Sequence, residues 1–135
     1  MFDTKIAIVV RHDLAAWQKL NVTAFLASGL ATETPDAIGR PYVDRAGRAY
    51  GRMFVQPVLV FAGEAADLQR AHRQALSRSL LCLPYVEAMF ATGHDAANRA
   101  VFAEEDPDAP NLVGVALRGP KKDVDKAVKG LKLHT

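Results

Sequence analysis

The sequence predicts a three-layer α/β/α fold in a single domain over residues 1–135. Apolar runs typical of strands alternate with segments of helical periodicity along the whole chain. No linker rich in Gly, Pro or Ser divides it. With 135 residues, of which 50% are hydrophobic, the chain suffices for one buried core without disulfides or metals. The alternation taken alone predicts an all-parallel sheet.

The first strand and the first helix are predicted near the N-terminus. Residues 5–10 form a β-branched run without alternation, which is typical of a strand buried on both faces. Asp13 is then placed to cap a helix over residues 14 to about 30. The inward face of this helix is expected to hold the apolar residues that recur at helical spacing, namely Leu14, Trp17, Leu20, Ala24 and Ala27.

A hairpin insert is expected at about residues 40–52, followed by a second strand. The turn of the hairpin is placed at residues 44–47, and residues 40–52 together carry four arginines. The second strand is predicted at residues 53–61, and Pro57 makes its first half an edge or an irregular segment.

The remaining elements continue the alternation. They are a helix over residues 64 to about 80, a strand at 85–90, a short helical segment within 92–99, a strand at 111–117 and a final helix that Pro120 opens. This final helix is expected to bury Val124, Val128 and Leu131 and to expose Lys122, Lys126 and Lys129.

Composition and motifs exclude several classes of protein. The 17 Lys and Arg nearly balance the 15 Asp and Glu, and the net charge of +2 is too small to indicate a nucleic-acid binder. The sequence shows no signal-peptide pattern and no membrane-spanning run, and the one cysteine, Cys82, excludes a disulfide framework. A soluble cytoplasmic protein is therefore expected. Because nucleotide-binding glycine motifs and clustered metal ligands are missing, we expect no cofactor and no metal.

Titratable side chains gather where two predicted strands end, which is where ligands usually bind in α/β folds. His94 and Asp95 follow the third strand and are candidate catalytic residues, because such side chains transfer protons near neutral pH. Candidate ligand-binding residues, with the arginines as anion clamps, are Arg11, His12, Asp13, Asn98 and Arg99. The alternative is structural, because Asp13 and Asp95 also stand where helix N-caps are expected.

Two segments near the ends of the chain resemble type II peptidyl-tRNA hydrolases. Lys5-Ile-Ala-Ile-Val-Val-Arg-His-Asp-Leu14 is similar to the opening strand and turn of that family, and Gly119-Pro120 with residues 124–133 is similar to its closing segment. A closer resemblance, over nearly the whole chain, is to the bacterial domain-of-unknown-function family 2000 (DUF2000), which is related in fold to those hydrolases. The closer resemblance lies in residues 17–26, 56–60, 92–95 with Asn98-Arg99, and 124–134.

The resemblance implies a mixed, mostly parallel four-stranded sheet plus the hairpin, with the last strand antiparallel to its neighbour. It also implies a homodimer, in which the hairpin insert either covers the site or extends the dimer interface. The hydrolase pattern of catalytic residues is not kept. Lys19 stands one residue away from the family's lysine, Ala24 or Thr23 replaces its glutamine, and a further change replaces its histidine by Ala27 or Leu26. The resemblance therefore implies the fold without the peptidyl-tRNA hydrolase reaction.

Three functions remain open at this point. The first is a small-ligand-binding or accessory protein on a hydrolase-like scaffold, with a small anion as its ligand. The second is a hydrolase or transferase of a small acyl or amide substrate, which uses His94 and Asp95 with Lys19. The third is RNA or tRNA binding through a basic surface made of Arg118, Lys122, Lys126 and Lys129.

Overall fold

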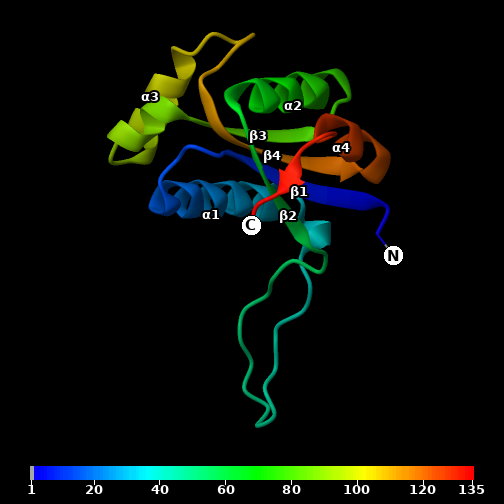
Figure 1. Cartoon of the computed structure of the whole chain (residues 1–135). Coiled ribbons are helices and arrows are strands. Elements are labelled where there is room, and N and C mark those ends of the chain that lie inside the picture. The colour runs from blue at the N-terminus through cyan, green and yellow to red at the C-terminus, as the bar shows by residue number, and fades with distance from the viewer. Residues whose placement is uncertain (1) are drawn as a thin grey trace.

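The computed structural model describes residues 2–135 as a central sheet with helices on both of its faces (Figure 1). In chain order the elements are β1 (Thr4–Arg11), α1 (Ala16–Glu33), β2 (Val58–Gly63), α2 (Ala65–Ser77), β3 (Leu81–Val86), α3 (Asp95–Ala103), β4 (Leu112–Pro120), α4 (Lys121–Ala127) and β5 (Lys132–Leu133). Two short 3-10 helices lie at Pro35–Ala37 and Glu87–Ala91.

The sheet has five strands within the described residues, in the order β3–β4–β1–β2–β5. β1 and β2 are parallel, whereas the other neighbouring pairs are antiparallel. The predicted four-stranded, mostly parallel sheet is therefore wrong in both respects. β4 lies between β3 and β1 and runs antiparallel to both, so β3 points the same way as β1 but does not pair with it. β5 has only two residues, too few to show a periodic pattern in the sequence.

Helices cover both faces of this sheet, and the predicted three layers are present (Figure 1). α2 and α4 pack on one face, where Leu68 and Val124 belong to the same buried cluster. α1 packs on the other face through Val22 and Leu26. β1 contributes to both clusters, and residues 6–10 are at most 1% exposed. The prediction of a strand buried on both faces is confirmed.

Helix α1 turns the face that was predicted to be buried toward solvent. Its buried residues are Val22, Leu26 and Leu30, while Trp17 and Leu20 are 62% and 72% exposed. Both faces of this helix carry apolar side chains, so helical spacing alone does not distinguish them. None of the helices that the structure describes combines the length and the apolar character needed to cross a membrane.

The N-terminal ends of α1 and α3 also differ from the predicted caps. Ala15 is the N-cap of α1, and Asp13 instead accepts a hydrogen bond from Arg11 at 2.7 Å. His94 is the N-cap of α3, and Asp95 is the first residue of the helix. Neither aspartate is therefore a cap.

Several strand boundaries shift from those predicted. β2 begins five residues later than expected, at Val58, after an irregular stretch. β3 begins at Leu81 and ends at Val86, because the chain then turns into the 3-10 helix that replaces most of the strand predicted at 85–90. Pro84 lies inside β3, where it is tolerated because β3 is an edge strand.

The C-terminal segment follows the predicted pattern of faces. Val124 and Val128 are buried and Leu131 is half-buried, while the three lysines predicted to face outward are exposed. The chain then passes along β2, where the backbone N–H of His134 donates to the carbonyl oxygen of Val60 at 2.8 Å. This contact closes the sheet edge beside β2.

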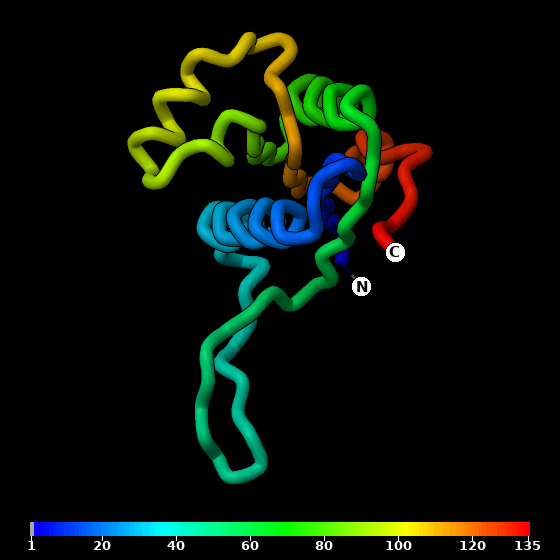
Figure 2. The backbone as a smooth tube through the Cα atoms, turned by 60° about the vertical axis from the view of Figure 1, so that its left-hand side comes forward, coloured from blue at the N-terminus to red at the C-terminus, as the bar shows by residue number. Residues whose placement is uncertain are grey.

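Residues 38–55 form a hairpin that projects from the sheet and helices, and we call this segment the arm (Figures 1 and 2). An isolated bridge joins Val43 to Ala49. The turn contains Gly47 at φ +87°, a left-handed conformation that glycine adopts at little cost. Residues 40–53 are all exposed, so this part of the arm buries no side chain against the rest of the chain.

Candidate functional site

A groove lies between α1 and α3, over the end of β3. It consists of two adjoining cavities of about 340 and 500 Å³, which share the lining residues Phe25, Tyr85, Met89, Asp95 and Asn98. Each cavity falls in the range of small-molecule sites, roughly 300–1,000 Å³. We call this pair of cavities the groove.

Aromatic side chains form the floor and one wall of the groove. Tyr85 is only 5% exposed, and its ring centroid lies 5.8 Å from that of Phe25 and 5.5 Å from that of Phe90. Trp17 packs edge-on against Phe90 at 5.9 Å. Trp17 and Phe25 still leave more than half of their surface exposed, so their rings offer apolar area to a ligand.

The wall on α1 results from the helical repeat. Trp17, Asn21 and Phe25 lie four residues apart and therefore share one face of the helix. Gly29 continues this row, and a Cβ at that position would lie 2.8 Å from Cδ1 of Leu83 on β3. The glycine thus permits the close approach of α1 to β3 at one end of the groove.

Charged and polar groups line the groove from the side of α3. The backbone N–H of Ala97 donates to Nδ1 of His94 at 3.2 Å, which leaves Nε2 to carry the proton of the neutral ring. The guanidinium of Arg99 donates to the carboxylate of Asp95 at 2.7 Å, and both side chains are largely exposed. The ring and the ion pair therefore lie at the solvent side of the groove.

Amide side chains add hydrogen-bonding capacity nearer the floor. Burial raises the pKa of Tyr85 above its usual range, and a hydrogen bond with the Asn21 side chain acts in the opposite direction. The phenol is therefore neutral at neutral pH. The hydroxyl of Thr92 donates to Oδ1 of Asn98. Each amide keeps further donors and acceptors for a ligand.

The structure brings together only part of the predicted site. The groove-lining members are His94, Asp95, Asn98 and Arg99. The members that lie outside the groove are Arg11, His12, Asp13 and Lys19.

Residues 11–13 form a separate ion-pair cluster at the end of β1. Arg11 pairs with Asp13 at 2.7 Å and with Glu87 at 3.7 Å, and its hydrogen bond lowers the pKa of Asp13 below the usual range. Nε2 of His12 lies 2.7 Å from a carboxylate oxygen of Glu64. The predicted anion clamp is therefore occupied by carboxylates of the chain itself.

Lys19 is also separate from His94 and Asp95. Its ammonium lies 3.1 Å from Nε2 of His134, on the side of α1 that faces the C-terminal segment. The three residues that the sequence combined as catalytic are therefore not assembled in one place.

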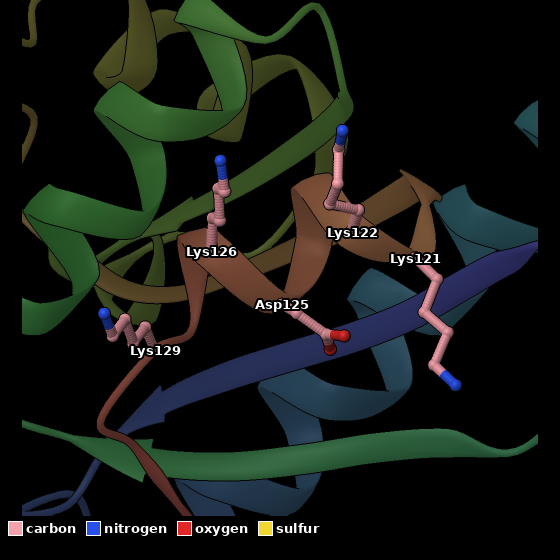
Figure 3. Close-up of a pocket in the computed structure, with 5 residues that line it drawn as sticks. All are labelled: Lys121, Lys122, Asp125, Lys126 and Lys129. Carbon is pink, nitrogen blue, oxygen red and sulfur yellow. The ribbon is translucent and has the colours of Figure 1, made fainter.

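The three lysines of the predicted basic surface line one cavity, whereas Arg118 does not line it. An open cavity of about 610 Å³ on α4 and the turn that follows it is lined by Lys121, Lys122, Asp125, Lys126 and Lys129 (Figure 3). Lys122 and Lys126 project from the same side of α4, whereas Lys121 points away from them. Arg118 belongs elsewhere, because its guanidinium pairs with Asp36 at 3.0 Å.

Within residues 2–135, no three His, Cys, Asp or Glu side chains are grouped so that they could hold a metal ion. Cys82 lies in β3 and is partly buried. Burial raises the pKa of this thiol to about 11, so it is protonated at neutral pH and is a poor nucleophile.

Sequence reasoning missed the aromatic wall of the groove. It placed Trp17 in the core, and it placed Tyr85 in a strand without a role in binding. One signal was present, because α1 carries more large apolar residues than a single buried face holds. With Val22 and Leu26 filling that face, Phe25 and Trp17 are left for another surface.

Fold and groove together define a three-layer α/β protein with a ligand-sized groove beside the edge of its sheet. The chain belongs to the DUF2000 family, described as a protein of unknown function, whose family model matches residues 4–135. Among solved structures, it is similar to a protein of unknown function from Agrobacterium tumefaciens strain C58. The two share 52% identity with a TM-score of 0.96, and 100% of each chain is covered. A comparison with curated proteins finds no match. The likeness to type II peptidyl-tRNA hydrolases stays a prediction from the sequence.

Proposed function

We propose that this protein binds a small molecule with an apolar ring in the groove, and that its function there is binding rather than catalysis. The observation that carries the proposal is the exposure of Trp17 and Phe25 beside the buried ring of Tyr85. A ligand that stacks on these rings removes their apolar surface from water, which stabilises the complex. The volumes of the two cavities suit such a ligand.

The polar groups of the groove favour a neutral ligand. Nε2–H of His94 and the amides of Asn21 and Asn98 supply donors and acceptors, which suit an amide or hydroxyl substituent on the ring. Arg99 is the cation that lines the groove, and it is already paired with Asp95. The small anion expected from the sequence is therefore less favoured than a neutral amide.

The same residues give little support to a hydrolase or transferase. Such a reaction needs a nucleophile that an adjacent base activates. Thr92 carries the one aliphatic hydroxyl among the groove-lining residues, and this hydroxyl donates to Asn98. His94 uses Nδ1 to cap α3 and has no hydrogen bond to Thr92. The groove therefore lacks a paired nucleophile and base.

Trp17 provides a direct test, because it is the one tryptophan of the chain. Its fluorescence and its single indole N–H resonance both report on the groove. The probes are benzamide, benzoate and acetamide, which separate the ring from the amide and from charge. We expect benzamide to shift both signals in a saturable way, benzoate to bind more weakly and acetamide to have no effect.

Variants connect the signal to the groove. Phe25→Ala and Asn98→Ala should each weaken benzamide binding by about tenfold, because a stacking ring or a hydrogen bond is lost. Leu76→Ala is the matched control, since Leu76 is equally exposed on α2, away from the groove. No saturable shift with benzamide, or equal weakening by the control, would contradict the proposal.

The lysines of α4 favour a second function, which is attraction of a polyanion such as RNA. Four lysines line this open cavity, although Lys121 points away from Lys122 and Lys126, and Asp125, the one carboxylate among the lining residues, pairs with Lys5. Phosphate contacts make binding fall with salt. Lys126→Ala should weaken binding of oligouridylate and reduce the salt slope by about one. Arg40→Ala makes the same charge change in the arm, and an equal effect of both variants would overturn the role of α4.

A further inference from the structure

The arm exposes several large apolar side chains. Twelve such side chains are exposed within residues 2–135, and nine of them lie on only two surfaces. Those in the arm are Tyr42, Val43, Tyr50, Met53 and Val55. Those on α1 and α3 are Trp17, Leu20, Phe25 and Phe102. Concentrated apolar exposure of this kind marks surfaces that meet a partner.

Charges next to these two surfaces have opposite sign. The arm carries Arg40, Arg45, Arg48 and Arg52, and its Asp44 accepts hydrogen bonds from backbone N–H groups of its own turn. The segment that follows α3 carries Glu104, Glu105, Asp106 and Asp108. None of these arginines and none of these four carboxylates forms an ion pair within residues 2–135. Both clusters are therefore available for pairing with each other.

The arm does not meet the groove of its own chain. In both views the arm and α3 lie at different ends of the molecule (Figures 1 and 2). The tip of the arm stands about eight residues from its base, which is roughly 25 Å of extended chain. An arm of this length reaches across the surface of a neighbouring molecule.

We propose that the arm of one protomer lies across the groove of a second copy of this chain, with its arginines against residues 104–108. In this proposal the contact is reciprocal: each copy places its arm in the groove of the other, and the pair closes as a two-fold dimer. The apolar side chains of the arm cover the exposed rings of α1. That the covered groove then holds a ligand rests on the proposed function above, whereas the contact between the two copies does not.

Docking supplies the packing that the arm lacks. A two-stranded hairpin that has no third strand and no helix packed against it is at best marginally stable in water. The second copy provides apolar surface for one face of the arm, and the opposite charges set the orientation in which the two copies meet. The groove is thereby complete only when the arm of the partner lies over it.

Charge exchange tests this contact in the full-length chain. One variant is Arg45→Glu/Arg48→Glu in the arm, and the other is Glu104→Lys/Asp108→Lys after α3. All four side chains are free of ion pairs in the described structure, so the fold of each variant should be kept. Sedimentation velocity measures the oligomeric state of wild type, of each variant, and of an equimolar mixture of the two.

We expect wild type to be a dimer and each variant alone to associate about a hundredfold more weakly, because like charges then face each other. In the mixed dimer, glutamates of one arm face lysines of the other copy, and the remaining arm and acidic segment are both unchanged. The mixture should therefore dimerise again. A monomeric wild type, unchanged association of either variant, or a mixture that stays monomeric would overturn the proposal.

The contact of the arm and the binding of a ligand are measured in separate experiments. In the mixed dimer the emission of Trp17 should shift to shorter wavelength, because the arm of the partner shields its ring from water. This shift needs no ligand, so it tests the arm alone. The benzamide titration tests the proposed function, and its failure would leave the charge-exchange result unaffected.

Discussion

Strand β1 and the arm are both extended structure, yet their surroundings are opposite. Residues 6–10 of β1 are at most 1% exposed, because β1 pairs with β2 and β4 and has helices on both faces. Residues 40–53 of the arm are exposed throughout, and their backbone hydrogen bonds stay within the arm. The two segments therefore differ in burial, and only β1 is part of a continuous sheet.

This difference shows where the stability of the chain resides. Each Å² of apolar surface removed from water contributes about 25 cal/mol, and β1, the strands beside it and the helices on both faces hold most of the buried side chains. The apolar side chains of the arm remain in water in a single chain, so they add little to its folding. Substitutions should therefore affect folding at β1 and association at the arm.

The largest loss of stability is expected in the strand beside β1. Leu117 of β4 is fully buried and lies opposite Ala7 and Cys82 in the sheet. Leu117→Ala removes apolar contacts and leaves a cavity, so the free energy of unfolding should fall by about 2–5 kcal/mol. Urea unfolding followed by circular dichroism measures this change. A loss below about 1 kcal/mol would show that the two faces of the sheet are not the main source of stability.

The next largest effect is expected where α1 meets β4. A Cβ at Gly114 would lie 2.3 Å from Cγ1 of Val22 and 3.2 Å from Cδ1 of Leu26. Gly114→Ala therefore forces α1 to shift, and we expect a loss of about 1–3 kcal/mol. Because Trp17 lies on the same helix, its emission should change in the folded protein. Gly51→Ala in the arm is the control, since a Cβ there meets nothing within 4 Å. Equal losses in the two variants would remove the contrast between the packed region and the arm.

The fold is predictable from the sequence where an element carries one unambiguous pattern. Residues 6–10 are uniformly apolar, and the structure buries all of them. α1 is apolar on two faces, so the choice between Trp17 and Val22 as the buried side depends on which face meets the sheet. The neighbours of each strand depend on pairing between distant segments, and no local pattern shows that β4 lies between β3 and β1.

The candidate site was predictable on one side only. Polar residues after β3 identify residues 92–99, six of which line the groove. The exit of β1 has a similar composition, but β4 separates β1 from β3 by two strand spacings, roughly 10 Å. Arg11 reaches Glu87 across this distance and extends no farther toward the groove. The aromatic wall could not be predicted without knowing which face of α1 is exposed.

A smaller effect is expected from pH, and it should arise in the packed region. His72 on α2 is 9% exposed, and its Nδ1 has no hydrogen-bond partner within residues 2–135. Burial lowers the pKa of His72, and the charge of Arg73 acts in the same direction. The unfolded chain thus binds this proton at a higher pH than the folded chain. The free energy of unfolding should therefore fall as the pH drops below about 6.5.

Urea unfolding at neutral pH and near pH 5.5 measures the decrease, which should be smaller than the loss in either core variant. His72→Gln does not titrate in this range, so its stability should change less over the same interval. A decrease of the same size in His72→Gln would assign the pH dependence to other groups.

The smallest change in the stability of the single chain is expected in the arm. Val43 and Met53 are 64% and 57% exposed, so truncating them removes almost no buried surface. At a protein concentration at which wild type sediments as a monomer, Val43→Ala and Met53→Ala should each change the free energy of unfolding by less than about 0.5 kcal/mol. Urea unfolding at that concentration is the measurement.

Raising the concentration then distinguishes a free arm from a docked one. Association of folded chains stabilises them by mass action, so the unfolding midpoint of wild type should rise with protein concentration. Met53→Ala should reduce this rise, because it weakens the contact between copies. Leu117→Ala should lower the midpoint at every concentration and keep the rise, because Leu117 is buried in the sheet. If the midpoint of wild type is independent of concentration, or if Met53→Ala costs as much as Leu117→Ala in the monomer, the contrast between β1 and the arm is wrong.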